Sequence, residues 1–169
     1  MESLGRGLVV EPYIPNVVLA GGLISRLGSE DQKKELLPKI ISGEIQMSVA
    51  FSEPQSRFDL NDVITVAKKE GDSYTIDGYK AVVMNGPSSN NMIIVARTSG
   101  NQLDEKGLTL FIVDPTLKGV SLRNYSNVDG SKASEVTLEN VSVSASSLLG
   151  KEGEAFTACL LYTSDAADD

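Results

Sequence analysis

The side chains best suited to chemistry lie together in residues 49–60, which read VAFSEPQSRFDL. Ser52 supplies a hydroxyl group, Glu53 a carboxylate and Arg57 a cation. A carboxylate can act as a general base, a hydroxyl can donate a hydrogen bond to a ligand, and an arginine can pair with an anion. For Glu53 the better interpretation is a structural carboxylate that accepts hydrogen bonds from turn amides. Helix-like periodicity gives way to strand-like alternation here, and ligands often bind at such junctions.

The composition excludes several kinds of chemistry. The sequence has no histidine, so Ser-His-Asp and Cys-His nucleophile pairs are absent, and catalysis would need carboxylates, a bound cofactor or residues outside this sequence. Cys159 is the single cysteine, so no internal disulfide forms, and no cluster of Cys and His supports a metal site. The net charge of -8, with both signs interspersed, argues against nucleic acid as a partner.

Length and hydropathy favour an ordinary globular protein. At 169 residues and 41% apolar composition, the chain fits one domain, alone or with pieces of its neighbours. No apolar run reaches the roughly 20 residues that span a bilayer, and residues 1–7 lack the layout of a signal peptide. We therefore expect no membrane association and a cytoplasmic location.

Two helices are expected before residue 45. The first begins near Pro15, is buried on most sides and closes at Gly28 in the left-handed conformation. The second runs from about residue 30 to 41, with a capping box from Ser29 and Gln32 and an end at Gly43. This helical pair has no core of its own, so it must pack on something else.

From residue 45 onward the apolar period becomes two, which predicts seven or eight short strands. The alternating runs are 45–51, 63–67, 73–76, 81–84, 92–97, 108–113, 119–125 and 135–143. Their spacing is typical of a barrel or sandwich, and Asp77-Gly78 is the strongest hairpin signal. Residues 148–156 predict the start of another helix, whereas the acidic, small-residue tail indicates a disordered or foreign end.

Five motifs in this order resemble the acyl-CoA dehydrogenase family over about residues 25–156. They are LLPKIISGE at 36–44, SEP at 52–54, YTIDGYK at 74–80, FIV at 111–113 and LLG at 148–150 with Gly153 following. The variant SEPQSRFDL most resembles the branch of pimeloyl-CoA dehydrogenase small subunits. The resemblance implies an α+β fold whose central part is an antiparallel β-barrel of seven or eight strands.

The resemblance also implies a division into domains. Residues 1–44 would end an N-terminal helical domain, 45–147 would form the middle β-barrel domain, and 148–169 would begin a C-terminal helical domain, with 159–169 disordered or foreign. The chain would then be a fragment. Family members desaturate an acyl-CoA with FAD and pass the electrons to an electron-transfer flavoprotein, as homo- or hetero-oligomers. Their catalytic glutamate belongs to the C-terminal bundle, so no residue of this chain is expected to be catalytic.

The resemblance also implies which residues of this chain contact the flavin. The family lays backbone amides and one hydroxyl along the polar edge of the flavin, at positions that match Phe51 and Ser52. The alternative for Ser52 is that it caps the turn made with Pro54. Val82 and Met84 match a tryptophan and a threonine that contact the flavin, so both of those side chains are missing, although the Met84 amide could still donate.

Arg57 and Phe58 replace residues near the phosphate region and are the expected substrate-binding residues. Arg57 could meet a CoA phosphate or the distal carboxylate of a dicarboxylyl substrate. Equally, it could pair with Asp59 or Asp62 on the surface. Two functions therefore remain open: an FAD-dependent acyl-CoA dehydrogenase, or a non-catalytic subunit or binding module that keeps the scaffold with weakened flavin binding.

Overall fold

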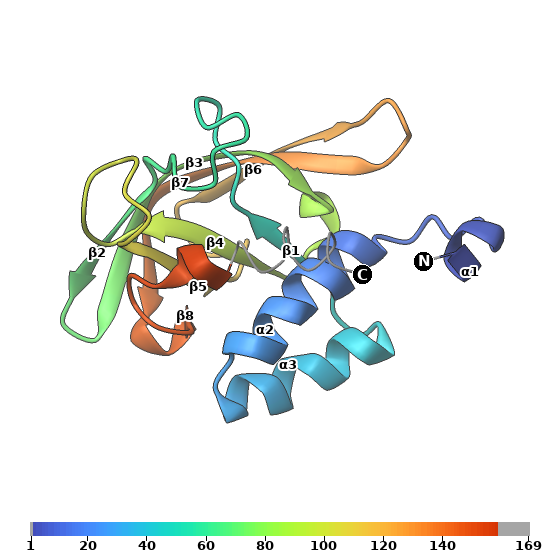
Figure 1. The fold of residues 1–169 in the computed structure, drawn as a ribbon, viewed down its shortest axis with the longest axis horizontal. Coiled ribbons are helices and arrows are strands. Elements are labelled where there is room, and N and C mark those ends of the chain that lie inside the picture. Colours follow the sequence, from blue (N-terminus) through green and yellow to red (C-terminus); the bar gives the residue numbers. More distant parts are fainter. Residues whose placement is uncertain (1, 159–169) are drawn as a thin grey trace.

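The computed structural model describes residues 2–158, and the expectation for residues 159–169 lies outside them. Helices pack on one side of a strongly bent sheet, while the short helix α1 (Glu2–Arg6) stands apart from this body (Figure 1). Within the described residues, no helix has both the length and the apolar character that a membrane crossing requires.

The first packed helix differs from the prediction. A π-helical segment, Ile14–Gly21, continues directly into α2 (Gly22–Leu27). The following Gly28 is extended, with φ of −61°, so the expected left-handed closure is wrong. Glycine is needed there because a Cβ atom would lie 2.6 Å from the carbonyl oxygen of Ile24. The expected burial on most sides is also wrong, since Val17 and Val18 are each 37% exposed.

Helix α3 (Glu30–Ser42) has the predicted ends. The Ser29 hydroxyl accepts from the Gln32 amide at 3.2 Å, and the Gln32 side chain accepts from the Ser29 amide at 3.0 Å, which completes the capping box. Gly43 ends the helix with φ of 77°. The Gln32 side chain also donates to the carbonyl oxygen of Leu148 at 3.0 Å, so the same residue ties this helix to the end of the sheet.

The helical pair packs on the sheet, as a pair without its own core must. Buried side chains of α2 and α3, among them Ile24 and Ile40, join residues of the sheet such as Met47 and Ile93 in one apolar cluster. A second cluster fills the interior between strands. A polar contact fixes the helices as well, because the buried Asn16 side chain accepts a hydrogen bond from the Met47 amide at 2.8 Å.

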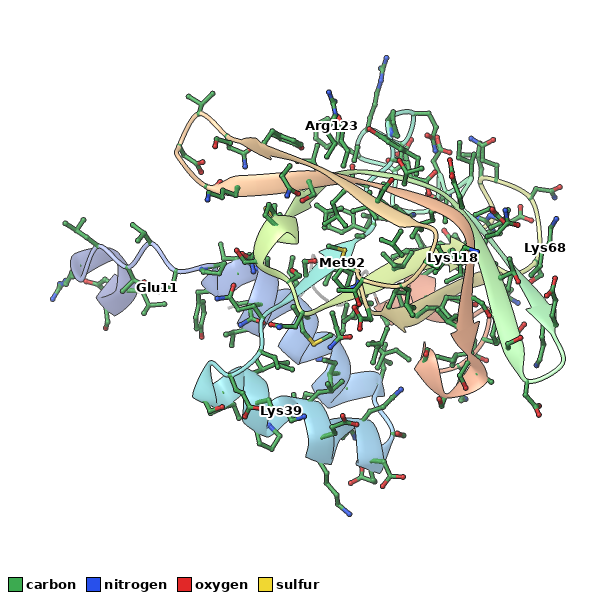
Figure 2. The ribbon with its side chains drawn as sticks, turned by 180° about the vertical axis from the view of Figure 1, so that it is seen from behind. Glu11, Lys39, Lys68, Met92, Lys118 and Arg123 are labelled. Carbon is green, nitrogen blue, oxygen red and sulfur yellow. The ribbon has the colours of Figure 1, made fainter. Side chains whose placement is uncertain are left out.

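Eight strands follow, which confirms the α+β class and the predicted number. They are β1 (Met47–Ala50), β2 (Val66–Glu70), β3 (Ser73–Met84), β4 (Asn91–Arg97), β5 (Leu108–Val113), β6 (Val120–Ser126), β7 (Lys132–Ser144) and β8 (Leu148–Leu149). Short 3-10 turns lie at Gly86–Ser88 and Ala145–Ser147. Figure 2 shows Met92 in the interior, where it is 1% exposed, and Lys68 and Arg123 at the surface.

The pairing order is β6-β7-β3-β2-β4-β5-β8, with β1 beside β4. Most neighbours are antiparallel, but β1 and β2 both pair with β4 in parallel. The predicted antiparallel pairing is therefore confirmed for most neighbours, and the two parallel pairs both involve β4. Within the described residues the two end strands, β6 and β8, do not pair with each other, so the sheet is not a closed barrel.

The predicted Asp77-Gly78 hairpin is wrong. Strand β3 runs straight through these residues with a bulge between Ile76 and Gly78, and the β2–β3 turn lies instead at Gly71, whose φ is 62°. Gly78 serves a close approach, because a Cβ atom there would lie 2.6 Å from the Cβ of Thr65. Asp77 accepts a hydrogen bond from the Asn140 amide at 2.7 Å and so fixes the neighbouring strand.

The predicted helix at 148–156 is also wrong at its start. Leu148 and Leu149 form strand β8, which pairs with Phe111 and Leu110 of β5. Helical residues begin only at Ala155 and continue to the end of the described part. The apolar pair Leu148-Leu149 is too short for periodicity to distinguish strand from helix, and the neighbouring strand decides it.

Candidate functional site

The end of β1 and a bulge in β3 lie against each other. The Ala81 amide donates to the carbonyl oxygen of Ser52 at 2.9 Å, which joins the two segments. The bulge falls between Lys80 and Val83, and Val82 within it has φ of 51°, an unusual conformation for a β-branched residue. The bulge turns the Val82 side chain outward, where it is 55% exposed, while Val83 is buried.

The four residues predicted to contact a cofactor therefore lie on two adjoining segments. We call Phe51, Ser52, Val82 and Met84 the β1–β3 face. Phe51 and Ser52 are half-buried, and Met84 is 38% exposed. Within the described residues, the Ser52 hydroxyl makes no hydrogen bond, so it is available to a ligand. No capping bond from Ser52 to the Pro54 turn is found there either.

The chemistry of this face fits a flavin ring. A flavin presents a flat apolar surface and a polar edge that accepts and donates hydrogen bonds. The β1–β3 face offers exposed apolar side chains at Val82 and Met84 beside one free hydroxyl at Ser52. A threonine at Met84 would have supplied a second hydroxyl, so the side-chain donor set is limited to Ser52, with backbone amides beside it.

A buried ion pair lies directly next to this face. The Lys80 ammonium is 2.6 Å from Oε1 of Glu53, and both side chains are fully buried. The Glu53 carboxylate also accepts from the amides of Ile64 at 2.8 Å and Thr65 at 3.1 Å. Every one of these contacts favours the ionised carboxylate, which places Glu53 as a structural acceptor of turn amides.

Opposing effects set the pKa of Glu53. Burial raises it, but the charge and the hydrogen bond of Lys80 and further hydrogen bonds lower it, and the net direction is downward from 4.5. The group is therefore ionised at neutral pH. A proton acceptor with a lowered pKa and all these fixed donors is a poor general base.

The stability of the protein at acid pH should depend on the ion pair between Lys80 and Glu53. Because the pKa of Glu53 is lower in the folded state, its contribution is complete above 4.5 and is lost as the pH falls through the folded value. We expect the difference in unfolding free energy between the wild type and Glu53→Gln to be largest at pH 7 and to shrink below about pH 5. Urea unfolding at several pH values measures it, and a difference that is constant with pH would contradict the assignment.

The turn that follows Glu53 is tightly held. The Ser56 hydroxyl accepts from the Glu53 amide at 3.1 Å and donates to the Glu53 carbonyl at 2.9 Å. Further along, the Gln102 side chain donates to Asp62 at 2.6 Å. The turn is thus anchored at its start by its own Ser56 and at its end by Gln102 from the β4–β5 loop.

Arg57 and Phe58 project from this fixed turn. Phe58 is 97% exposed, and Arg57 has a left-handed φ of 49°. Within residues 2–158, Arg57 forms no ion pair with Asp59 or Asp62, so the alternative of a surface ion pair is not observed. The structure places both predicted substrate-binding side chains in solvent, on the turn directly after the β1–β3 face.

The sequence alone did not indicate two residues of interest. One is Lys80, the ion-pair partner of Glu53, and the other is Arg97. Arg97 ends strand β4 and is 6% exposed, with its guanidinium among backbone carbonyl groups. A charge at the end of the apolar run MIIVAR is the signal that could have indicated it. Lys80 could have been found by counting in twos from the buried Tyr74 and Ile76 along β3.

A groove of about 380 Å³ lies elsewhere, between α3, the end of β5 and the end of β7. Its lining includes Gln32, Glu35, Asp114 and Ser144. None of the six predicted site residues lines it. The groove is therefore separate from the β1–β3 face.

The structure is of the α+β class, with a helical pair packed on a mixed sheet and a partly apolar exposed face beside a buried ion pair. The chain belongs to the acyl-CoA dehydrogenase family, since residues 48–141 match the family model "Acyl-CoA dehydrogenase, middle domain". Enzymes of this family are FAD-dependent oxidoreductases. The family model covers β1 to the middle of β7 and thus the whole β1–β3 face.

Curated relatives extend the similarity beyond the middle domain. A 3-(aryl)acrylate reductase of Clostridium sporogenes is 35% identical over 162 residues, which is 92% of this chain and 42% of that protein. The acyl-CoA dehydrogenase FadE29 of Mycobacterium tuberculosis is 32% identical over 146 residues, covering 85% of this chain and 38% of that protein. The chain thus spans about two fifths of the length of these relatives.

A solved structure agrees with the fold. Butyryl-CoA dehydrogenase of Megasphaera elsdenii superposes with a TM-score of 0.82 at 26% identity, over 88% of this chain and 39% of that chain. The similarity therefore covers the helical pair as well as the sheet.

Proposed function

We propose that these residues are part of an FAD-dependent acyl-CoA dehydrogenase that introduces a double bond next to the thioester of an acyl-CoA. The observation that carries the proposal is the β1–β3 face, where a free hydroxyl adjoins exposed apolar side chains. The proposed division is 1–44 for the end of a helical domain, 45–147 for the middle domain and 148–169 for the start of a second helical domain.

The chain's own residues would bind and orient rather than catalyse. Ser52 would donate its hydroxyl hydrogen to the polar edge of the flavin, and the backbone amides of Phe51 and Met84 would add donors. Val82 and Met84 cover the apolar surface and keep water from it. When bound, FAD supplies the acceptor for hydride from the acyl chain. The base that removes the proton is proposed to lie in the part of the protein beyond this chain.

Arg57 and Phe58 are proposed to face the substrate. An exposed arginine on a fixed turn suits an anionic group, either a CoA phosphate or the distal carboxylate of a dicarboxylyl chain. Phe58 adds an apolar contact beside it. Two further proposals follow from the family: electrons pass to an electron-transfer flavoprotein, and the whole protein is a cytoplasmic oligomer. The name of the Clostridium relative describes a reductase, so the direction of the reaction is part of what has to be measured.

The visible spectrum of the full-length protein tests this proposal. The open reading frame that contains this chain is expressed in full, purified and scanned before and after addition of FAD. We expect a yellow protein whose flavin absorption bleaches when an acyl-CoA is added without an electron acceptor. A protein that stays colourless with added FAD would refute it.

A colourless protein would favour the second candidate, a non-catalytic subunit or binding module. Val82 and Met84 favour this candidate, since neither side chain can donate a hydrogen bond to a flavin. Such a module would keep the stability of the fold and bind an acyl-CoA or a partner chain without FAD. Calorimetric titration with acyl-CoA in the absence of flavin distinguishes the two.

A further inference from the structure

Arg97 is held in an unusual way for a buried cation. Its five N–H groups face six backbone carbonyl oxygens at 2.8 to 3.4 Å, with the two N–H groups of one terminal nitrogen shared among three of them. These carbonyl groups belong to Asn61, Val63, Ser99, Gln102, Asp104 and Lys106. Within the described residues, no carboxylate lies at ion-pair distance from it, and burial lowers its pKa.

The carbonyl groups come from two separate segments. One is 61–63, which ends the fixed turn after Glu53, and the other is the β4–β5 loop at 99–106. A buried charge is tolerated when its surroundings supply hydrogen bonds. Arginine has five donors in a rigid planar fork, whereas lysine has three on one atom, so lysine could replace at most three of these hydrogen bonds.

The segment that Arg97 fixes leads directly to the β1–β3 face. Beyond Val63, the amides of Ile64 and Thr65 hold the Glu53 carboxylate, and the Arg97 amide itself donates to the Thr65 carbonyl at 2.8 Å. Glu53 is the residue after Ser52. A shift of residues 61–65 would therefore move Glu53 and with it the hydroxyl of Ser52.

We propose that Arg97 is a positioning residue for the β1–β3 face, acting through residues 61–65 and the Glu53 carboxylate. The role in cofactor binding rests on the proposed function, whereas the mechanical link from Arg97 to Glu53 does not. Lysine at this position keeps the positive charge but lacks the planar guanidinium group. Arg97→Lys therefore tests the hydrogen-bond geometry separately from the charge.

The test uses the full-length protein with Arg97→Lys and, as a control of comparable destabilisation, Val141→Ala. Val141 is fully buried on β7 and pairs with Ile76 of β3, four residues before the start of the bulge at Lys80–Val83. Two quantities are measured well below the melting temperature: the exchange rates of the Ile64 and Thr65 amides without FAD, and the FAD dissociation constant. We expect both to rise at least about tenfold in Arg97→Lys and to stay within about twofold in Val141→Ala, a tenfold change being about 1.4 kcal/mol.

The outcomes separate the two proposals. Equal exchange rates of Ile64 and Thr65 in both variants would overturn the role of Arg97. Faster exchange in Arg97→Lys without any FAD binding by the wild type would support the link and contradict the proposed function. If Arg97→Lys does not fold, native-state exchange of the wild type decides. The amides of Ile64 and Thr65 must then open with the same free energy as those of Val63 and Asp104, and separate opening would overturn the proposal.

Discussion

Replacing Lys80 with methionine is expected to lower the free energy of unfolding by about 3–5 kcal/mol, because it leaves the buried Glu53 carboxylate without its cation. The backbone amides of Ile64 and Thr65 and the side-chain amide of Gln55 also donate to Glu53, but these dipoles cannot neutralise a full charge. Protonation of Glu53 offers a partial escape, so the loss should be greatest at neutral pH. Urea unfolding followed by circular dichroism at pH 7 measures the change.

A second ion pair of the same length provides the control. Arg123 and Glu135 are also 2.6 Å apart, but Arg123 is 77% exposed on the outer strand β6 (Figure 2). Arg123→Met should therefore cost less than about 1 kcal/mol, as exposed pairs do. The double variant Lys80→Met with Glu53→Gln should recover part of the stability, because the side chain is then uncharged and its one oxygen still accepts from the amide of Ile64 or of Thr65. Equal losses in Lys80→Met and Arg123→Met would contradict the buried pair.

Ser52→Ala in the full-length protein is expected to weaken FAD binding about tenfold, the upper part of the range for one hydrogen bond. The Ser52 hydroxyl is the only side-chain donor on the β1–β3 face, so no neighbour in that face can replace it. Ser52→Thr keeps the hydroxyl and should restore most of the affinity. Fluorescence titration with FAD measures the dissociation constants.

Ser48, on strand β1 four residues before Ser52, offers a matched control. Its hydroxyl is fully buried and has no hydrogen-bond partner among residues 2–158, so Ser48→Ala should leave FAD affinity unchanged. Because removal of an unpaired buried hydroxyl is not costly, the fold should also keep its stability. Equal affinities in Ser52→Ala and the wild type would show that Ser52 does not contact the flavin.

Features that depend on local sequence were predicted well. The capping box of Ser29 and Gln32 and the left-handed end at Gly43 involve residues within one helical turn of each other, so their chemistry is readable in order. Most strands were located within a few residues, because one face of each is buried and alternation follows. The assignment of Phe51, Ser52, Val82 and Met84 to one site came from the family resemblance. The spacing of these residues along the sequence does not indicate that the two segments lie next to each other.

Features that depend on distant contacts were not predicted. Asp77-Gly78 looks like a turn, but Gly78 is needed because Thr65 approaches from another strand, and no local pattern distinguishes these cases. The bulge at Val82 reverses which residues face inward, so alternation fails beyond Lys80. Arg97 looks like a strand end, and its six acceptors come from backbone that the sequence does not mark.

Amide exchange of the full-length protein with and without FAD is the most direct test of whether the flavin binds at the β1–β3 face. We expect slower exchange at residues 51–52 and 82–84 when FAD is added, with little change around Glu35 and Asp114 in the separate groove. Protection confined to that groove or to other regions, in a protein that does bind FAD, would contradict the assignment of the β1–β3 face.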